Sequence, residues 1–350
     1  MPSKKIKLTR VCKAVSLALV LVIAAVLGAC TSDAPTETVT QTQTETQTST
    51  QTQTITEVPL YGNLQIYHAG SLTIPFAEIS DAFNEIYPDV NILAEGAGSA
   101  TTIRKVTELE KECGVIGSAD YSLIPELMYP DFADWYIIFA SNQMCLTYTD
   151  TSAFADEITS DNWYEILQSG VTYGRSDPDQ DPCGYRTLMV WQLAEIHYDD
   201  AAGLYDSLFE AEGDLMRPKS VDLIALLESG DLDYAFEYTS VAAQHGLNYI
   251  ELPPEINLAD VTFSDFYSQA EVEIAGAEPD ETITMTGKPI VYGVTIPSNF
   301  PRMELAVAWV DFLLSPDGVA IMEANGQPPI TPAVTDNIDA LPEELKKYVE

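Results

Sequence analysis

Two serines in matching settings are the residues of this chain best suited to bind a ligand. An apolar strand pattern over residues 64–69 stops at Gly70-Ser71, and apolar residues at helical spacing follow directly. The same order of strand, small-residue turn and helix recurs at Gly98-Ser99. A helix that opens directly after such a turn has unpaired backbone N–H groups and the positive end of its dipole there. We therefore expect each turn to bind an anion and the two turns to face one ligand.

An ordinary helix N-cap is the alternative reading of either serine. For one serine alone the N-cap would be the better interpretation. Two serines that each follow a glycine in the same context favour the ligand-binding interpretation.

The order of the surrounding elements predicts an α/β protein. Strand and helix patterns alternate from residue 64 to residue 118, as in a mostly parallel sheet whose turns gather at one edge. A second unit of the same kind spans roughly 149–286, and a strand at 289–296 and a helix at 303–314 complete the first unit. We expect lobe I over 59–147 plus 289–350, lobe II over 148–288, and a ligand cleft between them. Each lobe is expected to hold a mixed sheet flanked by helices, with chain crossings near 147 and 288.

The N-terminal segment is predicted to be a secretion signal. Five basic residues precede an apolar stretch over 14–26, which is short for a membrane span and leads into Leu27-Gly28-Ala29-Cys30. This pattern predicts a signal peptide over 1–29, lipidation of Cys30 and anchoring to the outer face of the membrane. An uncleaved anchor helix is the alternative. The Thr/Gln-rich composition of 30–58 predicts a solvated tether.

The mature chain is strongly acidic. Cleavage after residue 29 removes five of the 16 Lys and Arg, which leaves 11 against 54 Asp and Glu and a net charge near −43. This charge argues against nucleic acid or an anionic membrane surface as a partner. An anionic ligand would therefore depend on short-range hydrogen-bond donors in a closed cleft.

The cysteines and histidines of the chain say little about disulfide bridges or metal sites. The mature chain keeps Cys113, Cys145 and Cys183 besides Cys30, so one disulfide bridge is open as an option. The three histidines have no metal-ligand spacing.

Several further segments, taken in order with the signal and the tether, resemble one family. They are His68-Ala69-Gly70-Ser71-Leu72, Ala97-Gly98-Ser99-Ala100, Ser118-Ala119-Asp120-Tyr121, Asp181-Pro182-Cys183-Gly184-Tyr185-Arg186, Arg217-Pro218-Lys219 and Tyr292-Gly293-Val294-Thr295-Ile296-Pro297. Together they resemble the archaeal tungstate- and molybdate-binding proteins of ABC uptake transporters. The resemblance implies a two-lobed periplasmic-binding-protein fold of type II and closure on a tetra-oxo anion. It also implies delivery to a permease with its ATPase, a monomer, no cofactor and no enzymatic activity.

The resemblance also implies site residues. Lobe I would contribute Gly70, Ser71 and Ser99. Lobe II would contribute Asp181, the backbone around Pro182 and Cys183, Ser220 and the Tyr238 phenol. Since proline lacks an N–H, Cys183 and Gly184 are the expected backbone donors of that turn. For Tyr238, packing as a half-buried aromatic is the alternative.

Ser220 departs from the family pattern. In the family, as the resemblance aligns it, a glutamate follows the Arg-Pro-Lys segment. The carboxylates of this glutamate and of the aspartate at the Asp181 position bind the metal and raise its coordination from four to six oxygens. Here the glutamate position is Ser220, and Asp181 remains the candidate direct ligand of bound tungsten or molybdenum. We expect a tetrahedral anion held by hydrogen bonds, with Asp181 either outside the metal's coordination shell or weakly coordinating. Arg175 and Arg186 are expected to pair with carboxylates rather than to contact the ligand.

Other functions fit parts of the sequence. Sulfate or phosphate is the chief alternative ligand. A surface hydrolase built on Ser71 and His68 is disfavoured because the chain lacks a G-x-S-x-G motif. An adhesion domain would explain the anchor but not the paired turns.

Overall fold

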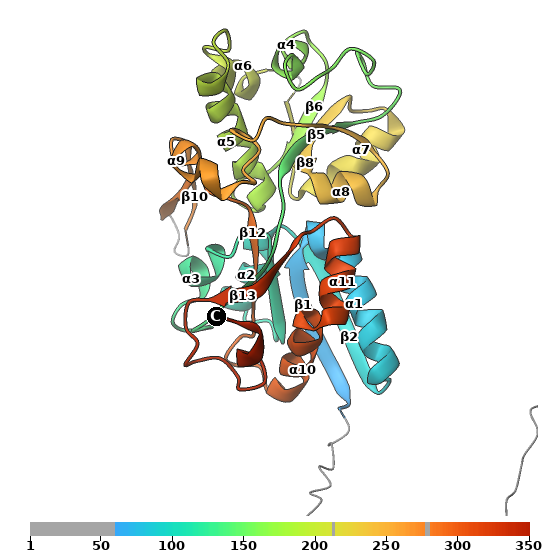
Figure 1. Ribbon diagram of the computed structural model, residues 1–350, viewed down its shortest axis with the longest axis vertical. Helices are drawn as coiled ribbons and strands as arrows, with labels where there is room; N and C mark the ends of the chain where they lie inside the picture. Colours follow the sequence, from blue (N-terminus) through green and yellow to red (C-terminus); the bar gives the residue numbers. More distant parts are fainter. Residues whose placement is uncertain (1–59, 212–213, 277–280) are drawn as a thin grey trace, which may run out of the picture. The chain divides into compact units, whose positions relative to one another are not determined.

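The computed structural model describes residues 60–211, 214–276 and 281–350, which belong to one compact unit (Figure 1). The expected signal peptide (1–29), the lipidated Cys30 and the tether (30–58) lie outside the described residues. The described chain forms two larger sheets, each flanked by helices, and a third sheet of two strands. We call the parts built around the two larger sheets lobe I and lobe II.

Lobe I contains a six-stranded mixed sheet in the order β13-β4-β12-β3-β1-β2. Its strands are β1 (Gly62–Ala69), β2 (Val90–Ala97), β3 (Val115–Ser118), β4 (Ile137–Ser141), β12 (Val291–Thr295) and β13 (Pro329–Thr335). β1 runs parallel to β2 and β3, whereas β12 runs antiparallel to β3 and β4. The last part of the chain thus completes the first sheet, and the N-terminal turns of α1 and α2 lie at one edge.

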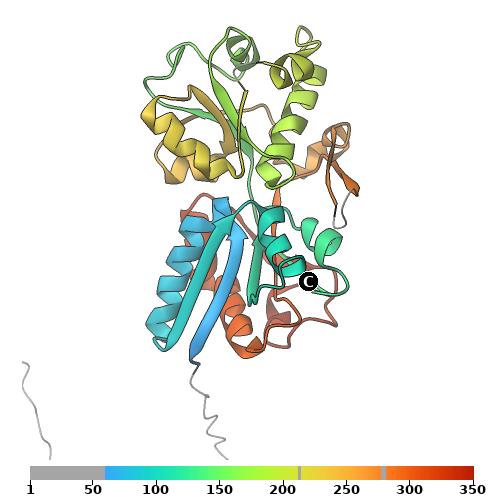
Figure 2. The same ribbon diagram turned by 180° about the vertical axis from the view of Figure 1, so that it is seen from behind.

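Helices cover both faces of this sheet (Figure 2). They are η1 (Gly70–Leu72), α1 (Thr73–Ile86), α2 (Ser99–Thr107), α3 (Leu123–Met128), α10 (Met303–Leu314), α11 (Pro316–Ala324) and η4 (Lys346–Tyr348). Phe76, Ile79 and Phe83 form the buried stripe of α1, as their helical spacing predicts. Phe76 meets Trp309 of α10 with ring centroids 4.9 Å apart.

Lobe II contains a five-stranded sheet in the order β7-β6-β8-β5-β9. Its strands are β5 (Met144–Tyr148), β6 (Tyr173–Ser176), β7 (Asp214–Arg217), β8 (Tyr234–Tyr238) and β9 (Asn248–Glu251). Because β5 pairs with β8 over its whole length and with β9 from Cys145 to Tyr148, the expected lobe boundary at 147/148 is wrong by a few residues. The first crossing lies between β4 and β5, at Asn142 and Gln143.

The helices of lobe II are short apart from one. They are α4 (Trp163–Leu167), α5 (Pro182–His197), α6 (Leu204–Phe209), η2 (Ser220–Leu223), α7 (Ile224–Ser229), α8 (Thr239–Gln244), η3 (Val261–Phe263) and α9 (Ser264–Tyr267). Asp181 caps α5 and Pro182 occupies its first turn. Most of α5 is buried, so its N-terminus is held firmly at the edge of the sheet.

A hairpin of β10 (Glu271–Ala275) and β11 (Thr282–Thr286) precedes the second crossing, which runs from Gly287 to Ile290. Within the described part of the chain, no single helix is long and apolar enough to cross a bilayer. α10 and α11 reach that length together but are bent by 62° between them.

Candidate functional site

The two lobes are in contact at the loops that follow strands of the two sheets. Gly98, the N-cap of α2 in lobe I, lies against the loop that precedes α5 in lobe II. A Cβ at Gly98 would lie 2.1 Å from the carbonyl oxygen of Gln180, so only glycine permits this approach. Thr101 N donates to the same oxygen at 3.4 Å. Gly70 lies against lobe II as well, with a hypothetical Cβ 3.1 Å from Val221 Cγ2.

Ser71 lies buried in η1, directly after β1. Its Oγ accepts a hydrogen bond from Tyr292 Oη at 3.0 Å, and that phenol accepts one from Asn142 Nδ2 at 2.8 Å. Gln327 Nε2 donates a hydrogen bond to the Ser71 carbonyl oxygen at 2.8 Å. Since the Ser71 hydroxyl serves here as an acceptor, its own proton is left for another partner.

Ser99 is fully buried at the first turn of α2. Its Oγ accepts a hydrogen bond from the Ala119 N–H at 3.0 Å. As with Ser71, the hydroxyl proton of Ser99 is left to donate.

Tyr238 ends β8 in lobe II, and its phenol is buried. Its Oη accepts from Arg186 Nη1 at 2.7 Å, and the same Nη1 donates to the Ala119 carbonyl at 2.7 Å. Burial raises the pKa of Tyr238 well above its ordinary value despite the nearby guanidinium. The phenol therefore stays protonated and can donate.

These contacts join the two lobes in one network. The Ala119 peptide binds Ser99 through its N–H and Arg186 through its carbonyl. The Tyr238 ring lies 6.2 Å from the Tyr292 ring, and Tyr292 in turn binds Ser71. The structure thus brings the predicted residues Ser71, Ser99 and Tyr238 together, each with a hydroxyl oriented by a hydrogen bond that it accepts.

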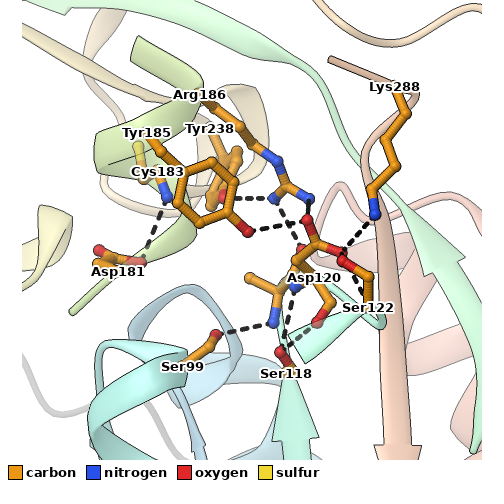
Figure 3. Close-up of polar contacts among 11 residues, drawn as sticks. Ser99, Ser118, Asp120, Ser122, Asp181, Cys183, Tyr185, Arg186, Tyr238 and Lys288 are labelled. Atoms are coloured by element: carbon orange, nitrogen blue, oxygen red, sulfur yellow. Dashed lines mark hydrogen bonds and ion pairs between the residues drawn. The ribbon is translucent and has the colours of Figure 1, made fainter. Parts of the chain in front are cut away.

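Asp120 and Arg186 form a buried ion pair across the lobes (Figure 3). Asp120 Oδ2 lies 3.2 Å from Arg186 Nη2 and accepts from Tyr185 Oη at 2.8 Å. Burial alone would raise the pKa of Asp120, but Lys288 and Arg186 outweigh it and lower that pKa to about 2. Asp120 is therefore charged. The prediction that Arg186 pairs with a carboxylate is confirmed.

Arg175 likewise pairs with a carboxylate, as predicted. Its Nη2 lies 2.8 Å from Asp214 Oδ2, and both side chains are largely buried within lobe II.

The cysteines of the described chain are buried free thiols: Cys113, Cys145 and Cys183.

Asp181, Pro182, Cys183 and Ser220 form a second cluster at the start of α5. Asp181 Oδ2 accepts from Ser220 N at 2.8 Å, and Oδ1 accepts from Cys183 N at 3.4 Å. The Gly184 N–H donates to the Asp181 carbonyl. The N–H groups expected to face the ligand at Cys183 and Gly184 are thus engaged within their own turn. Cys183 Sγ lies 3.6 Å from the Phe236 carbonyl.

Glu237 also reaches this cluster, although strand alternation points it away from Tyr238. It is fully buried and Oε2 accepts from the Tyr238 N–H at 2.7 Å, whereas Oε1 has no hydrogen-bond partner among the residues that the structure describes. Burial raises the pKa of Glu237 to about 8, with the Asp181 carboxyl adding to the rise and Ser220 opposing it. Glu237 is therefore largely protonated at neutral pH.

We predict that Glu237 makes the folded protein less stable as the pH rises. The folded state keeps a proton on Glu237 up to about pH 8, whereas the unfolded chain releases it near 4.5. The free energy of unfolding should therefore fall between these values, by at most about 1.4 kcal/mol per pH unit from this one group. Urea denaturation of Glu237→Gln should show a flatter dependence, while the exposed Glu251→Gln should keep the wild-type slope. Equal slopes in wild type and Glu237→Gln would contradict this assignment.

Sequence reasoning missed Asp120, Asn142, Tyr292 and Lys288. Asp120 follows β3 at the same sheet edge as the two serines, which is a usable signal. Tyr292 lies inside β12, in a segment that carries the resemblance but to which the resemblance gave no site role. Asn142 lies in the first crossing, where no local pattern sets it apart.

The Ser71 and His68 pair of a hydrolase is not formed. Ser71 binds Tyr292, and His68 Nδ1 lies 2.8 Å from the Ala69 carbonyl. Burial lowers the pKa of His68 to about 4, so the ring is neutral.

Comparison with known proteins decides the family. The family model described as bacterial extracellular solute-binding protein matches residues 64–327. The chain belongs to this family. A solute-binding protein of Petrotoga mobilis is 49% identical over 295 residues, which cover 83% of this chain and 90% of the relative. The molybdate/tungstate-binding protein WtpA of Pyrococcus abyssi is 40% identical over 316 residues, covering 82% and 90%. Membership makes the chain an extracytoplasmic binding protein and not an enzyme.

Solved structures confirm the fold. The Azotobacter vinelandii periplasmic molybdate-binding protein matches with a TM-score of 0.56 at 17% identity, over 75% of this chain and 98% of that one. The sulfate-binding protein SubI of Mycobacterium tuberculosis matches with the same score at 13% identity, over 77% and 88%. The expected two-lobed periplasmic-binding-protein fold is therefore correct.

Proposed function

We propose that this protein is the solute-binding component of an ABC importer and captures tungstate or molybdate between its lobes. Ser71, Ser99 and Tyr238 donate hydrogen bonds to the oxyanion, which is delivered to a permease with its ATPase. The protein acts as a monomer without a cofactor. A lipid on Cys30 anchors it to the extracellular face of the cell membrane. If so, Cys30→Ser should appear in the growth medium instead of the membrane fraction.

The observation that carries this proposal is the orientation of the three hydroxyls. Each accepts a hydrogen bond from the protein, through Tyr292, Ala119 and Arg186 respectively. Each is therefore left with a proton to donate. Buried hydroxyls that each keep a proton to donate suit an anion whose oxygens all accept, and hydrogen bonds to charged groups are stronger than neutral ones.

The curated relatives support the choice of anion. WtpA of Thermococcus kodakarensis, also named molybdate/tungstate-binding, is 38% identical over 317 residues, covering 82% of this chain and 87% of the relative. This is a second relative of that name besides the one from Pyrococcus abyssi.

The hydrogen bonds of Asp181 indicate whether its carboxylate can coordinate the metal. Both of its oxygens already accept backbone N–H groups, and the position expected to supply a second carboxylate is Ser220. We therefore infer that the anion stays tetrahedral, with Asp181 outside its coordination shell. The same engagement of Asp181 disfavours hydrogen phosphate, whose proton needs an acceptor in the site.

Isothermal titration of the 58–350 fragment, cleared of bound ligand, tests the proposal. Tungstate, molybdate, sulfate and phosphate are compared at matched salt. We expect tight binding of the first two and binding of sulfate weaker by orders of magnitude. Tighter binding of sulfate or phosphate would replace the proposed ligand, and no binding of any of the four would refute the function.

Removal of one serine hydroxyl should weaken tungstate binding without unfolding the protein. A hydrogen bond to a charged group contributes about 1.5–3 kcal/mol, so Ser71→Ala and Ser99→Ala should each lose roughly tenfold to a hundredfold in affinity. Ser80→Ala removes a buried hydroxyl of α1 that binds the Phe76 carbonyl, and it should leave the affinity unchanged. Wild-type affinity in both Ser71→Ala and Ser99→Ala would contradict the site.

A further inference from the structure

Asp120 joins three separate parts of the molecule at one buried carboxylate, as Figure 3 shows. Within lobe I, Oδ1 accepts from the N–H and the hydroxyl of Ser122 at 2.9 and 2.8 Å. Lys288 Nζ, in the second crossing, lies 3.4 Å from the same oxygen. Oδ2 turns to lobe II, where it accepts from Tyr185 Oη at 2.8 Å and pairs with Arg186 Nη2 at 3.2 Å.

We propose that Asp120 locks the two lobes together and thereby sets the lifetime of the loaded form. Its side chain need not touch the ligand, so it is a positioning residue. The identity of the ligand rests on the proposed function, whereas the lock between the lobes follows from the contacts of Asp120 alone.

Charge makes this lock specific for the closed arrangement. Asp120 and Arg186 are almost completely buried where the lobes meet, with 1% and 2% of their side chains exposed. With the lobes apart, the carboxylate and the guanidinium would each be hydrated. With the lobes together and the carboxylate neutralised, Arg186 would be buried without its counter-ion. Loss of the Asp120 charge therefore penalises the closed arrangement only.

The lock also orients two of the ligand-binding hydroxyls. Arg186, held by Asp120, donates to Tyr238 Oη and to the Ala119 carbonyl. The Ala119 N–H holds Ser99 Oγ. Formation of the ion pair thus brings the donors of lobe I and lobe II into register, which couples closure to capture.

The test uses the full-length chain with Asp120→Asn, Tyr185→Phe and the control Asp81→Asn, an exposed aspartate of α1. The protein is loaded with tungstate and chased with excess molybdate, and retained tungsten is measured by mass spectrometry. We expect tungsten to leave Asp120→Asn at least about tenfold faster and Tyr185→Phe about fivefold faster, since both lose bonds to a charged group. Asp81→Asn should match the wild type.

Unchanged release from both Asp120→Asn and Tyr185→Phe would overturn the proposal. If Asp120→Asn does not fold, Tyr185→Phe still tests the proposal, because it removes one hydrogen bond between the lobes and keeps the Asp120 carboxylate. Small-angle scattering of the ligand-free chain separates this proposal from the proposed function. If the wild type does not bind tungstate, a larger radius of gyration in either variant still supports the lock, and an equal radius refutes it.

Discussion

Gly98→Ala should abolish tight ligand binding while leaving the fold intact. The added Cβ would lie 2.1 Å from the Gln180 carbonyl oxygen in the other lobe. The backbone angles of Gly98 suit any residue (φ −60°, ψ 144°), so the conflict arises only when the lobes meet. Because close-packed contacts do not yield by this amount, we expect tungstate affinity to fall by roughly a hundredfold or more, or about 2.8 kcal/mol. Isothermal titration measures the loss, and the circular dichroism spectrum of the variant should match that of the wild type because each lobe stays folded.

Gly70→Ala is the matched control for that prediction. Its Cβ would meet Val221 Cγ2 at 3.1 Å, and a side chain can move where a backbone carbonyl cannot. We expect a smaller loss of affinity, recovered in part by Val221→Ala. Binding of Gly98→Ala with wild-type affinity would show that the ligand does not need this contact between the lobes.

Arg186→Met should reduce tungstate affinity by on the order of a thousandfold. The guanidinium pairs with Asp120 and donates to Tyr238 and Ala119, so its loss leaves a buried carboxylate with one fewer counter-ion. Breaking a buried ion pair costs about 3–5 kcal/mol. Since the pair spans the lobes, we expect this cost to appear in binding more than in unfolding. Titration calorimetry and urea denaturation measure the two quantities separately.

Arg175→Met provides the comparison. Arg175 is equally buried and paired, but its partner Asp214 lies in the same lobe. This change should lower the free energy of unfolding and leave tungstate affinity within a fewfold of the wild type. Equal weakening of tungstate binding by Arg175→Met and Arg186→Met would contradict the role of the Arg186 ion pair between the lobes.

The local parts of the site were predictable from the sequence. At Gly70-Ser71 and at Gly98-Ser99 the order is strand, glycine, serine and helix. This order places the two serines at the carboxyl ends of the neighbouring parallel strands β1 and β2. Asp181-Pro182 likewise signals the start of α5, because an aspartate cap and a proline in the first turn both favour a helix start. Such patterns depend only on neighbouring residues.

The parts that depend on distant residues were not predictable. Tyr292 reaches Ser71 across 221 positions, and Tyr185 reaches Asp120 across 65. The lobe boundary was misplaced because Met144–Tyr148 reads equally well as the last strand of either sheet, and only its pairing with β8 and β9 decides. Strand alternation points Glu237 away from Tyr238, but alternation gives only the face of a residue and not what packs against that face.

The most direct test of the account is the position of tungsten in crystals of the tungstate-loaded protein, located by anomalous diffraction. We expect one strong peak between the lobes, with four oxygens around the metal and the hydroxyls of Ser71, Ser99 and Tyr238 at hydrogen-bond distance from them. A peak elsewhere on the molecule would contradict the site. A metal bonded directly to the Asp181 carboxylate would contradict the tetrahedral, hydrogen-bonded anion.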